Sequence, residues 1–167
     1  EFDSHEWSFL SPTHYLDLIS DKSEYDLPED FAIVSGRITY AAATSIQYPV
    51  ISLVSEEQVR FNLQSTATSA RPCLAAVRVK HSNENTGTRY ELLVAPIPSE
   101  ARQIAIPYSI NPEQLGSDQA LPMGGQPHAQ TIIEACLAAA EIQTKLGNVH
   151  QQEFLNCLRT SVSHDRR

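Results

Sequence analysis

The sequence predicts an α+β fold, in which an antiparallel β-rich body, a small sandwich or barrel, is followed by two C-terminal helices. Two observations lead to this class. Apolar side chains recur at the strand period of two over most of residues 14–110, and at the helical period of 3.6 after residue 126. Strands followed by helices are typical of α+β proteins, not of doubly wound parallel sheets. With 167 residues, 41% of them hydrophobic, the chain is long enough to bury a core.

We expect one structural domain made of three segments. These are an acidic N-terminal lead-in at residues 1–24, a β-rich body at residues 25–120 and a C-terminal helical segment at residues 126–167. The lead-in contains an apolar group around Trp7 and a short strand near residues 15–19, and it shows no helical stripe.

The net charge of −8 is concentrated at the start of the chain. Residues 1–30 hold nine acidic residues and one basic residue, whereas residues 31–125 hold seven of each and residues 126–167 hold four of each. An acidic segment does not bind a phosphate backbone by neutralising its charge. We therefore expect that any nucleic acid in contact with this protein is enclosed by it and is not bound through its phosphate charges.

The stretch YDLPEDF, residues 25–31, surrounds one proline with three acidic residues. Pro28 disfavours the helical region for Leu27 and can open a tight turn. Calcium loops space their oxygen ligands at alternate positions and place glycine at the sharp bend, and this stretch does neither. The sequence therefore predicts a structural corner instead of a metal site. The corner residues are Tyr25, Leu27, Pro28, Asp30 and Phe31.

The residues after the corner predict a strand, a second extended segment and a short helix. Residues 31–40 alternate in the manner of a strand, and residues 47–54 are apolar and β-branched. Ser55 suits an N-cap, and Gln58 follows at the spacing of a capping box. We therefore expect a short helix at residues 55–60.

The clearest supersecondary signal is a hairpin. Residues 73–80 and 89–95 both read as strands, and the polar cluster at residues 81–88 separates them. Residues 102–110 predict one more strand, and residues 111–115 predict a single helical turn. Together these segments complete the β-rich body.

Two helices close the chain. Pro127 suits the first position of a helix. The apolar face expected for this helix consists of Ala129, Ile132, Ile133, Cys136, Leu137 and Ala140. A second helix is expected to begin near His150, with an apolar side made of Phe154, Leu155, Leu158 and Val162. The polar residues 163–167 are expected to fray.

The search for chemistry finds no convincing active site. The six histidines form no H-x-x-x-H pair, and the chain contains no G-x-S-x-G elbow and no phosphate-binding glycine loop. Gly124 and Gly125 precede a helix and are a weak anion signal without a nearby lysine. The three cysteines, at positions 73, 136 and 157, are expected to be buried, reduced thiols. The sequence predicts no catalytic residue, no metal site and no cofactor, and hence a protein that is not an enzyme.

The basic residues of the β-rich body do not form a stripe with interleaved aromatics, as a nucleic-acid platform would. We expect them to be cross-strand charge partners or interface residues. They are Arg71, Arg78, Lys80, Arg89 and Arg102.

The order of the short motifs is more specific than any one of them. The first half of the series is Trp7-Ser8-Phe9-Leu10, Tyr25-x-Leu27-Pro28-x-Asp30-Phe31, Pro49-Val50-Ile51 before Ser-Glu-Glu, and Arg71-Pro72. The second half is Pro96-Ile97-Pro98, Ile106-Pro107-Tyr108-Ser109-Ile110, Pro112-Glu113-Gln114-Leu115 and Ala138-Ala139-Ala140-Glu141. Over nearly its whole length, the chain resembles the head–tail connector or adaptor proteins of tailed bacteriophages, which include gatekeeper-like neck proteins.

This resemblance implies a structural virion protein. Such adaptors form a homo-oligomeric ring, typically a dodecamer, between the portal and the next neck or tail component. Genome DNA passes through the ring without sequence-specific binding, and no membrane is involved. The resemblance places the protein at the head–tail interface of the virion, after assembly in the host cytoplasm.

In relatives the C-terminal segment engages the portal, which implies a docking region in this chain from Leu155 to Arg167. The residues implied are Leu155, Leu158, Arg159, Val162, Arg166 and Arg167. For the last two residues the alternative is an ordinary solvated tail. Two other classes of function remain open: a small β-rich carbohydrate- or ligand-binding module, and a hydrolase.

Overall fold

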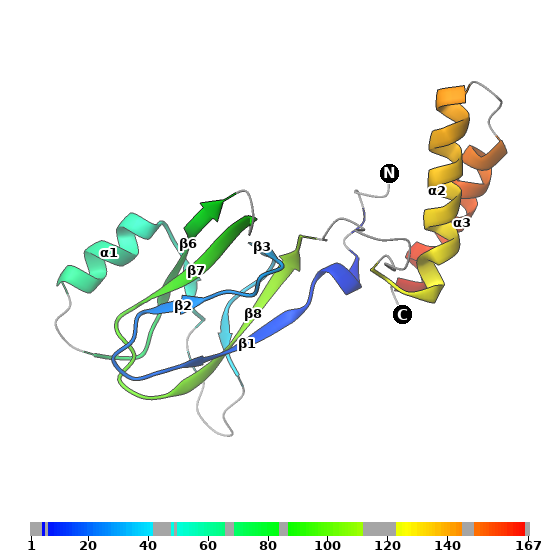
Figure 1. Cartoon of the computed structure of the whole chain (residues 1–167). Helices are drawn as coiled ribbons and strands as arrows, with labels where there is room; N and C mark the ends of the chain where they lie inside the picture. The colour runs from blue at the N-terminus through cyan, green and yellow to red at the C-terminus, as the bar shows by residue number, and fades with distance from the viewer. Residues whose placement is uncertain are drawn as a thin grey trace. The chain divides into compact units, whose positions relative to one another are not determined.

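The protein forms two compact units, which are described separately below (Figure 1). Residues 12–111 make up the β unit, and residues 1–11 together with 112–167 make up the helical unit. We expected a single domain with residues 1–24 as its lead-in, but the lead-in is divided between the two units. In this computed structural model the described residues are 5, 7–41, 48, 50–65, 69–83, 87–111, 123–144 and 149–165.

The described part of the β unit contains eight strands in two sheets. The first sheet consists of β1 (Thr13–Leu18), β8 (Arg102–Ile110), β3 (Phe31–Val34) and β4 (Thr39–Tyr40). The second consists of β2 (Glu24–Asp26), β7 (Gly87–Ala95), β6 (Leu74–Asn83) and β5 (Ser52–Leu53). All pairings are antiparallel except that of β5 with β6. The α+β class, with an antiparallel β-rich body before two C-terminal helices, is confirmed.

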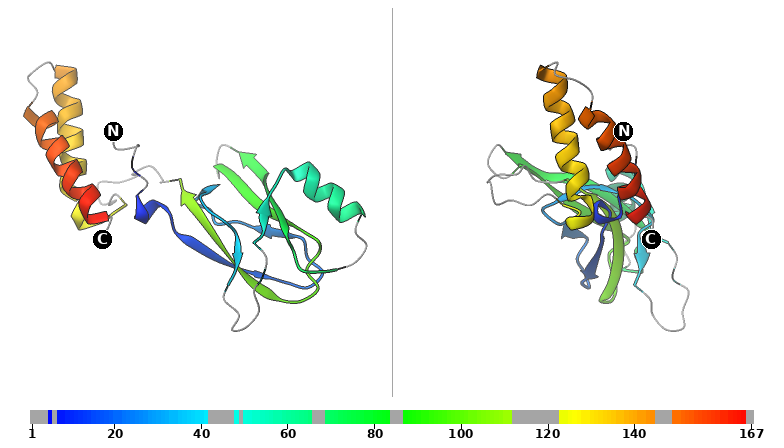
Figure 2. Two further views of the ribbon diagram at one scale, coloured as in Figure 1. Left: turned by 180° about the vertical axis from the view of Figure 1, so that it is seen from behind. Right: turned by 90° about the vertical axis from the view of Figure 1, so that its right-hand side faces the viewer.

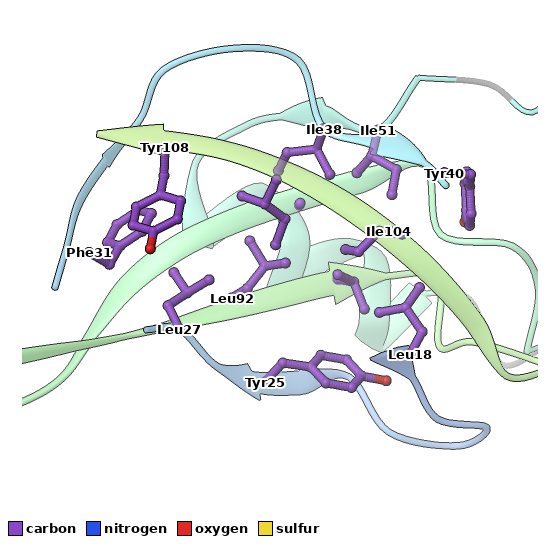
Figure 3. Close-up of a cluster of buried hydrophobic side chains, with 13 residues drawn as sticks. Leu18, Tyr25, Leu27, Phe31, Ile38, Tyr40, Ile51, Leu92, Ile104 and Tyr108 are labelled. Carbon is purple, nitrogen blue, oxygen red and sulfur yellow. The ribbon is translucent and has the colours of Figure 1, made fainter. Parts of the chain in front are cut away.

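The core of the β unit lies between the two sheets (Figure 3). Leu18 and Ile104 come from the first sheet and Leu92 comes from the second, and all three are fully buried. Burying a side chain of this kind contributes about 1.5–3 kcal/mol to stability. Tyr40 satisfies its hydroxyl in the core by donating a 2.7 Å hydrogen bond to the carbonyl of Pro72, and burial raises the pKa of Tyr40 to about 12.

The second sheet also packs against helix α1 (Glu56–Ser65). Strand β7 is therefore buried on both faces: Leu92 faces the inter-sheet core, while Leu93 joins Val59 of α1 in a second apolar cluster. Helix α1 begins as expected, since the amide of Gln58 donates to the Ser55 hydroxyl oxygen at 3.4 Å. It is longer than the predicted residues 55–60.

The predicted hairpin is confirmed as β6 and β7, which pair from Leu74 and Ala95 to Asn83 and Gly87. The polar cluster placed in the turn contributes several residues to the strands, so the hairpin is longer than expected. The helical turn predicted at residues 111–115 lies, apart from Asn111, outside the described residues.

The single strand predicted at residues 31–40 is interrupted, and this expectation was wrong. Its two ends, β3 and β4, pair with the same strand β8 at different levels, around Tyr108 and Ile104. Between them the chain crosses Pro107, which has no N–H to donate to a ladder. A Cβ at Gly36 would lie 2.9 Å from the Pro107 ring, so glycine permits this close approach.

The helical unit contains a hairpin of two long helices, α2 (Gln126–Thr144) and α3 (Val149–Asp165). They lie side by side and run in opposite directions (Figure 2). The predicted fraying after residue 162 was wrong up to Asp165, which ends α3. In the described part of the chain, no helix has both the length and the apolar character that spanning a bilayer would require.

The face that α2 turns towards the interior of the helical unit is not the predicted apolar face. Its buried residues include Thr131 and Ala138, and Thr131 shares a 2.6 Å hydrogen bond with Ser161 of α3. In contrast, Ile133 and Leu137, which we expected to be inside, are 51% and 40% exposed. The α2–α3 contact therefore combines small and polar side chains with apolar ones such as Leu158.

The cysteines also differ from expectation. Cys73 and Cys136 are exposed, and Cys157 is half-buried, so the prediction of three buried thiols was wrong. Cys136 is exposed because it belongs to the stripe of α2 that faces away from the interior.

Candidate functional site

The corner at residues 25–31 is held by backbone hydrogen bonds on both sides of its proline. The Phe31 amide donates to the Pro28 carbonyl at 3.1 Å and closes a turn. The Leu27 amide donates to the carbonyl of Tyr90 at 3.1 Å and ties the corner to β7. The Tyr25 hydroxyl donates a 2.7 Å hydrogen bond to the Lys22 carbonyl. These contacts fix the path of the chain from the second sheet into the first.

Aromatic side chains pack behind the corner. The ring of Phe31 stacks on Tyr108, with centroids 5.6 Å apart, and meets Tyr90 edge-on at 5.4 Å. The Tyr108 hydroxyl donates to Asp30 Oδ1 at 3.1 Å. Burial, together with this carboxylate, raises the pKa of Tyr108. Asp30 is thus occupied by the fold, and its backbone carbonyl also accepts from the Asn111 amide at 2.7 Å.

The other acidic residues of the corner are paired with bases from the β6–β7 hairpin. Asp26 lies 2.6 Å from Lys80, and Glu29 lies 2.9 Å from Arg89. The hydrogen bond from Lys80 holds the pKa of Asp26 below its ordinary value. Among the described residues, no three His, Cys, Asp or Glu side chains are grouped so as to hold a metal ion.

Arg78 is the centre of the charge network on the second sheet. It reaches Glu91 on the neighbouring strand β7, Glu24 of β2 at 3.0 Å, and Glu56 of α1 at 3.3 Å. The hydrogen bond with Glu91 is the main cause that raises the pKa of Arg78. Glu91 is itself buried, so Arg78 compensates a carboxylate that has lost much of its water.

The five basic residues that the sequence analysis named in the β-rich body are ion-paired, which is one of the two roles left open for them. Lys80 and Arg89 reach corner acids, and Arg71 and Arg102 share Glu100, at 3.6 Å and 2.9 Å. These contacts account for five residues that might otherwise have formed a nucleic-acid platform.

A second polar site ties the N-terminal segment to the end of α3. Ser8 begins a 3₁₀ helix (Ser8–Leu10), and its hydroxyl donates to Asp165 Oδ1 at 2.6 Å. His5 Nε2 lies 2.8 Å from Asp165 Oδ2. Burial alone would raise the pKa of Asp165, but the hydrogen bonds from Ser8 and His5 outweigh it and lower that pKa.

This group brings together a serine, a histidine and an aspartate, but not in the order that catalysis needs. In a catalytic triad the histidine lies between the serine, whose proton it removes, and the carboxylate. Here Asp165 lies between Ser8 and His5, so among the described residues the Ser8 hydroxyl contacts a carboxylate and not an imidazole. The group is a clasp for the N-terminal segment. We refer to His5, Ser8 and Asp165 as the N-terminal clasp.

The aromatic part of the same segment packs on His128, in the first turn of α2. His128 is 5% exposed, and its ring centroid lies 5.1 Å from Trp7 and 5.0 Å from Phe9. Gly124 allows this packing, because its φ is +99° and a Cβ there would lie 3.0 Å from both Phe9 and His128. His128, near the start of α2, is therefore a packed residue.

The docking residues implied by the resemblance differ in accessibility. Leu158 is buried within the helical unit, whereas Leu155 and Val162 are half-buried. Arg159 is exposed on α3. Arg166 and Arg167 lie outside the described residues. Among the described positions of this set, only Arg159 is exposed.

Sequence reasoning missed the N-terminal clasp and the outward stripe of α2. No local pattern connects His5 to Asp165, which lie 160 positions apart. The stripe had a signal: Thr131 and Ala138, seven residues apart, mark an alternative inner face. We chose the more apolar face instead.

Comparison with known proteins found no family model that matches the chain and no curated protein with significant sequence similarity.

Proposed function

We propose that this protein is a structural virion protein of a tailed bacteriophage. In this proposal it acts as a head–tail adaptor, forms a ring of typically twelve copies between the portal and the tail or neck, and lets genome DNA pass through. One observation supports the proposal most: two of the short motifs that resemble the adaptor family, those around Phe31 and Tyr108, pack against each other in the β unit, and a third, at Trp7–Leu10, anchors the N-terminal segment in the helical unit.

Within the β unit, the corner motif and the motif around Tyr108 form a single packed group. Phe31 stacks on Tyr108, and Asp30 accepts the Tyr108 hydrogen bond, although the two motifs are 78 positions apart. Residues that make such contacts restrict which residue types their partners can have, as expected of motifs inherited within a common fold. A chance succession of short matches has no reason to meet in this way.

Within the helical unit, the first motif has a similar role. Trp7 and Phe9 enclose His128, and Ser8 between them binds Asp165. The segment is thereby attached to the start of α2 and to the end of α3. This supports a helical unit whose C-terminal end is held in a defined position, as portal docking requires.

The proposed mechanism is assembly. Ring formation and portal binding bury surface on each copy, and the exposed Arg159 and the basic residues 166–167 would meet polar or acidic groups of the portal. Because the excess acidic charge lies in the first thirty residues, the ring would not hold passing phosphates tightly. The protein would then reside in the neck of the virion.

The test is native mass spectrometry of the chain alone and mixed with the purified portal of its phage. We expect a complex that contains one portal ring and about twelve adaptor chains, the number that the family resemblance implies. Arg159→Glu should weaken the complex. Arg60→Glu on α1, the same change at an exposed arginine of the other unit, is the matched control. Virions that lack the protein should leak DNA and fail to attach tails.

A different outcome would favour a different function. A chain that ignores the portal but binds glycans would favour the carbohydrate-binding module. That module needs neighbouring exposed aromatics, and the two most exposed described aromatics, Tyr15 and Phe61, lie on β1 and on α1. Substrate turnover by the purified chain would favour a hydrolase and contradict the adaptor proposal.

A further inference from the structure

Helix α2 has two chemically different sides. Its only charged residues are Glu134 and Glu141, and both are bound by α3. Glu134 Oε2 lies 2.8 Å from the His150 ring, and Glu141 Oε2 accepts the His150 amide at 2.9 Å. Both charged side chains of this helix therefore contact α3 within the hairpin, and the opposite side of α2 carries no charged residue.

The opposite side of α2 carries an apolar stripe. At 100° per residue, its members fall within a sector about 100° wide, opposite to the buried Thr131 and Ala138. The members are Ala129, Ile133, Cys136, Leu137 and Ala140, and all are exposed except Ala129, which is half-buried. We call these five residues the α2 stripe. Their spacing is that of a buried helix face, but the described part of the helical unit does not cover them.

Helix α3 provides an internal comparison. Its exposed described residues are polar, apart from Val149 at its first position. They include Gln152, Asn156 and Arg159, as expected of a helix that faces water. Two helices of one hairpin thus have opposite outer surfaces, and only that of α2 has the composition of an interface core, which is depleted of charge.

We propose that a second copy of this chain covers the α2 stripe, with the two α2 helices antiparallel about a twofold axis. The register supports this occupant. If the axis passes between Cys136 and Leu137, residue n of one copy meets residue 273 − n of the other. Ile133 then faces Ala140, and Cys136 faces Leu137. Each large side chain meets a small one, as closely packed helices require.

Charge also favours a second copy. Residues 126–167 hold four acidic and four basic residues, so two helical hairpins approach each other without net repulsion, although the whole chain carries −8. The α2 stripe itself is uncharged. A partner with a charged face would have to bury that charge against apolar side chains, at a cost of several kcal/mol per ion.

One pair of helices buries less than the standard interface of about 800 Å² per partner, so the dimer forms reversibly and depends on concentration. A twofold contact is closed and does not propagate into a ring. The dimer therefore goes beyond the proposed adaptor function: it is a state of the free protein that would open before a ring assembles.

Cys136 lies beside the proposed axis and provides the experiment. Two helices pack with axes about 8–10 Å apart, so a short bifunctional maleimide can join the two Cys136 thiols across the contact. In a C73S/C157S background we expect a crosslinked dimer whose yield increases with protein concentration. A C136S/C157S variant, which retains the exposed Cys73 of the β unit, is the control and should remain largely monomeric.

Substitutions on the α2 stripe should abolish the dimer without unfolding the chain. Leu137→Glu places a charge at the axis, and we expect at least a tenfold weaker association by sedimentation equilibrium. Gln152→Glu, on the exposed side of α3, is the matched control and should associate as the parent chain does. Circular dichroism and Trp7 fluorescence should show that both variants remain folded.

Three results would overturn the inference. If the chain is monomeric at every concentration and Cys136 reacts freely with maleimide, the stripe is not covered in the free protein. If it is monomeric and Cys136 is protected, another part of the same chain covers the stripe. If it forms larger species without a dimer, the contact is not twofold. A chain that fails to dimerise but assembles on the portal would leave the adaptor proposal intact.

Discussion

Strand β8 of the β unit and helix α2 of the helical unit use their apolar residues in opposite ways. In the β unit, the alternating side chains of β8 place Ile104 and Ile106 in the core between the sheets, where both are fully buried. In the helical unit, the most apolar side of α2 faces outward, and the contact with α3 includes small and polar groups such as Thr131 and Ser161. Strand β8 thus buries its hydrophobic pattern within the chain, whereas α2 leaves part of its pattern uncovered.

This difference shows that an apolar periodicity in the sequence does not always mark the side chains that are buried within the same chain. The hydrophobic pattern of a sequence reflects which side chains are buried in the functional state of the protein, and that state can be an assembly. For β8 that state is the single chain. For the α2 stripe, we infer that it is a complex. The two units can be perturbed separately, because Trp7, the single tryptophan, lies in the helical unit and reports on it alone.

The largest effect is expected in the core of the β unit. Ile104→Ala removes a fully buried side chain and should cost about 2–5 kcal/mol of the free energy of unfolding. Urea denaturation followed by circular dichroism should show the β unit unfolding at lower urea. Ile133→Ala, the same change at an exposed position of α2, should shift the monomer by less than about 0.5 kcal/mol. If the two variants were equally destabilised, the two units would not differ as described.

A smaller loss is expected from the charge network. Arg78→Met leaves the buried Glu91 without its cation and should cost about 1–3 kcal/mol, less than a fully buried pair because Arg78 is partly exposed to solvent. Lys80→Met breaks the exposed pair with Asp26 and should cost much less than Arg78→Met, because solvent screens an exposed pair. The measurement is chemical denaturation of both variants at low and high salt. Equal losses in the two variants would mean that burial of Glu91 has no influence.

The N-terminal clasp should be weaker still, and specific to the helical unit. Asp165→Asn removes the charge that binds His5 and Ser8 and should cost about 1–2 kcal/mol, with the change seen in Trp7 fluorescence. The pKa of Asp165 is lowered in the fold, so its contribution is present above the ordinary value of 3.8 and is lost as pH falls through the lowered pKa. His164→Asn, at the exposed neighbouring position, should change neither signal. A fluorescence transition that is the same in Asp165→Asn and the parent would exclude the clasp.

Much of the β unit followed from local rules in the sequence. The β6–β7 hairpin, the strand at residues 102–110 and the cap at Ser55 depend on alternation and on one local hydrogen bond, and these can be read from neighbouring residues. The pairing of the body's basic residues also followed, because strands bring side chains of opposite charge together.

What could not be predicted depends on contacts distant in sequence. The interruption at Gly36 requires the knowledge that Pro107 lies opposite, and the clasp requires that Asp165 returns to Ser8. The inner face of α2 was misassigned because the strongest apolar stripe was taken to face the interior of the same chain. Besides Thr131 and Ala138, the positions of Glu134 and Glu141, beside the inner face, could have shown which side meets α3.

The smallest expected effect is the pH dependence of the α2–α3 contact. The hydrogen bond with Glu134 raises the pKa of His150 above its ordinary value of 6.5, and the same bond lowers the pKa of Glu134 below 4.5. The histidine's contribution to stability is complete below 6.5 and is lost as pH rises through its raised pKa. The glutamate's contribution is present above 4.5 and is lost as pH falls through its lowered pKa. The pair should therefore hold the hairpin most firmly between about pH 4.5 and 6.5.

An NMR titration of the histidine rings measures this effect directly. We expect His150 to titrate above its ordinary value of 6.5, and Glu134→Gln should move its titration back towards that value. If His150 kept its raised pKa in that variant, the cause would lie with Glu141, whose carboxylate accepts the His150 amide. In that case both carboxylates of α2 would still contact α3 on the inner side, and the α2 stripe would still carry no charged residue. The contrast between the two sides of this helix thus depends on where its charges are bound, and not on which of them dominates the titration.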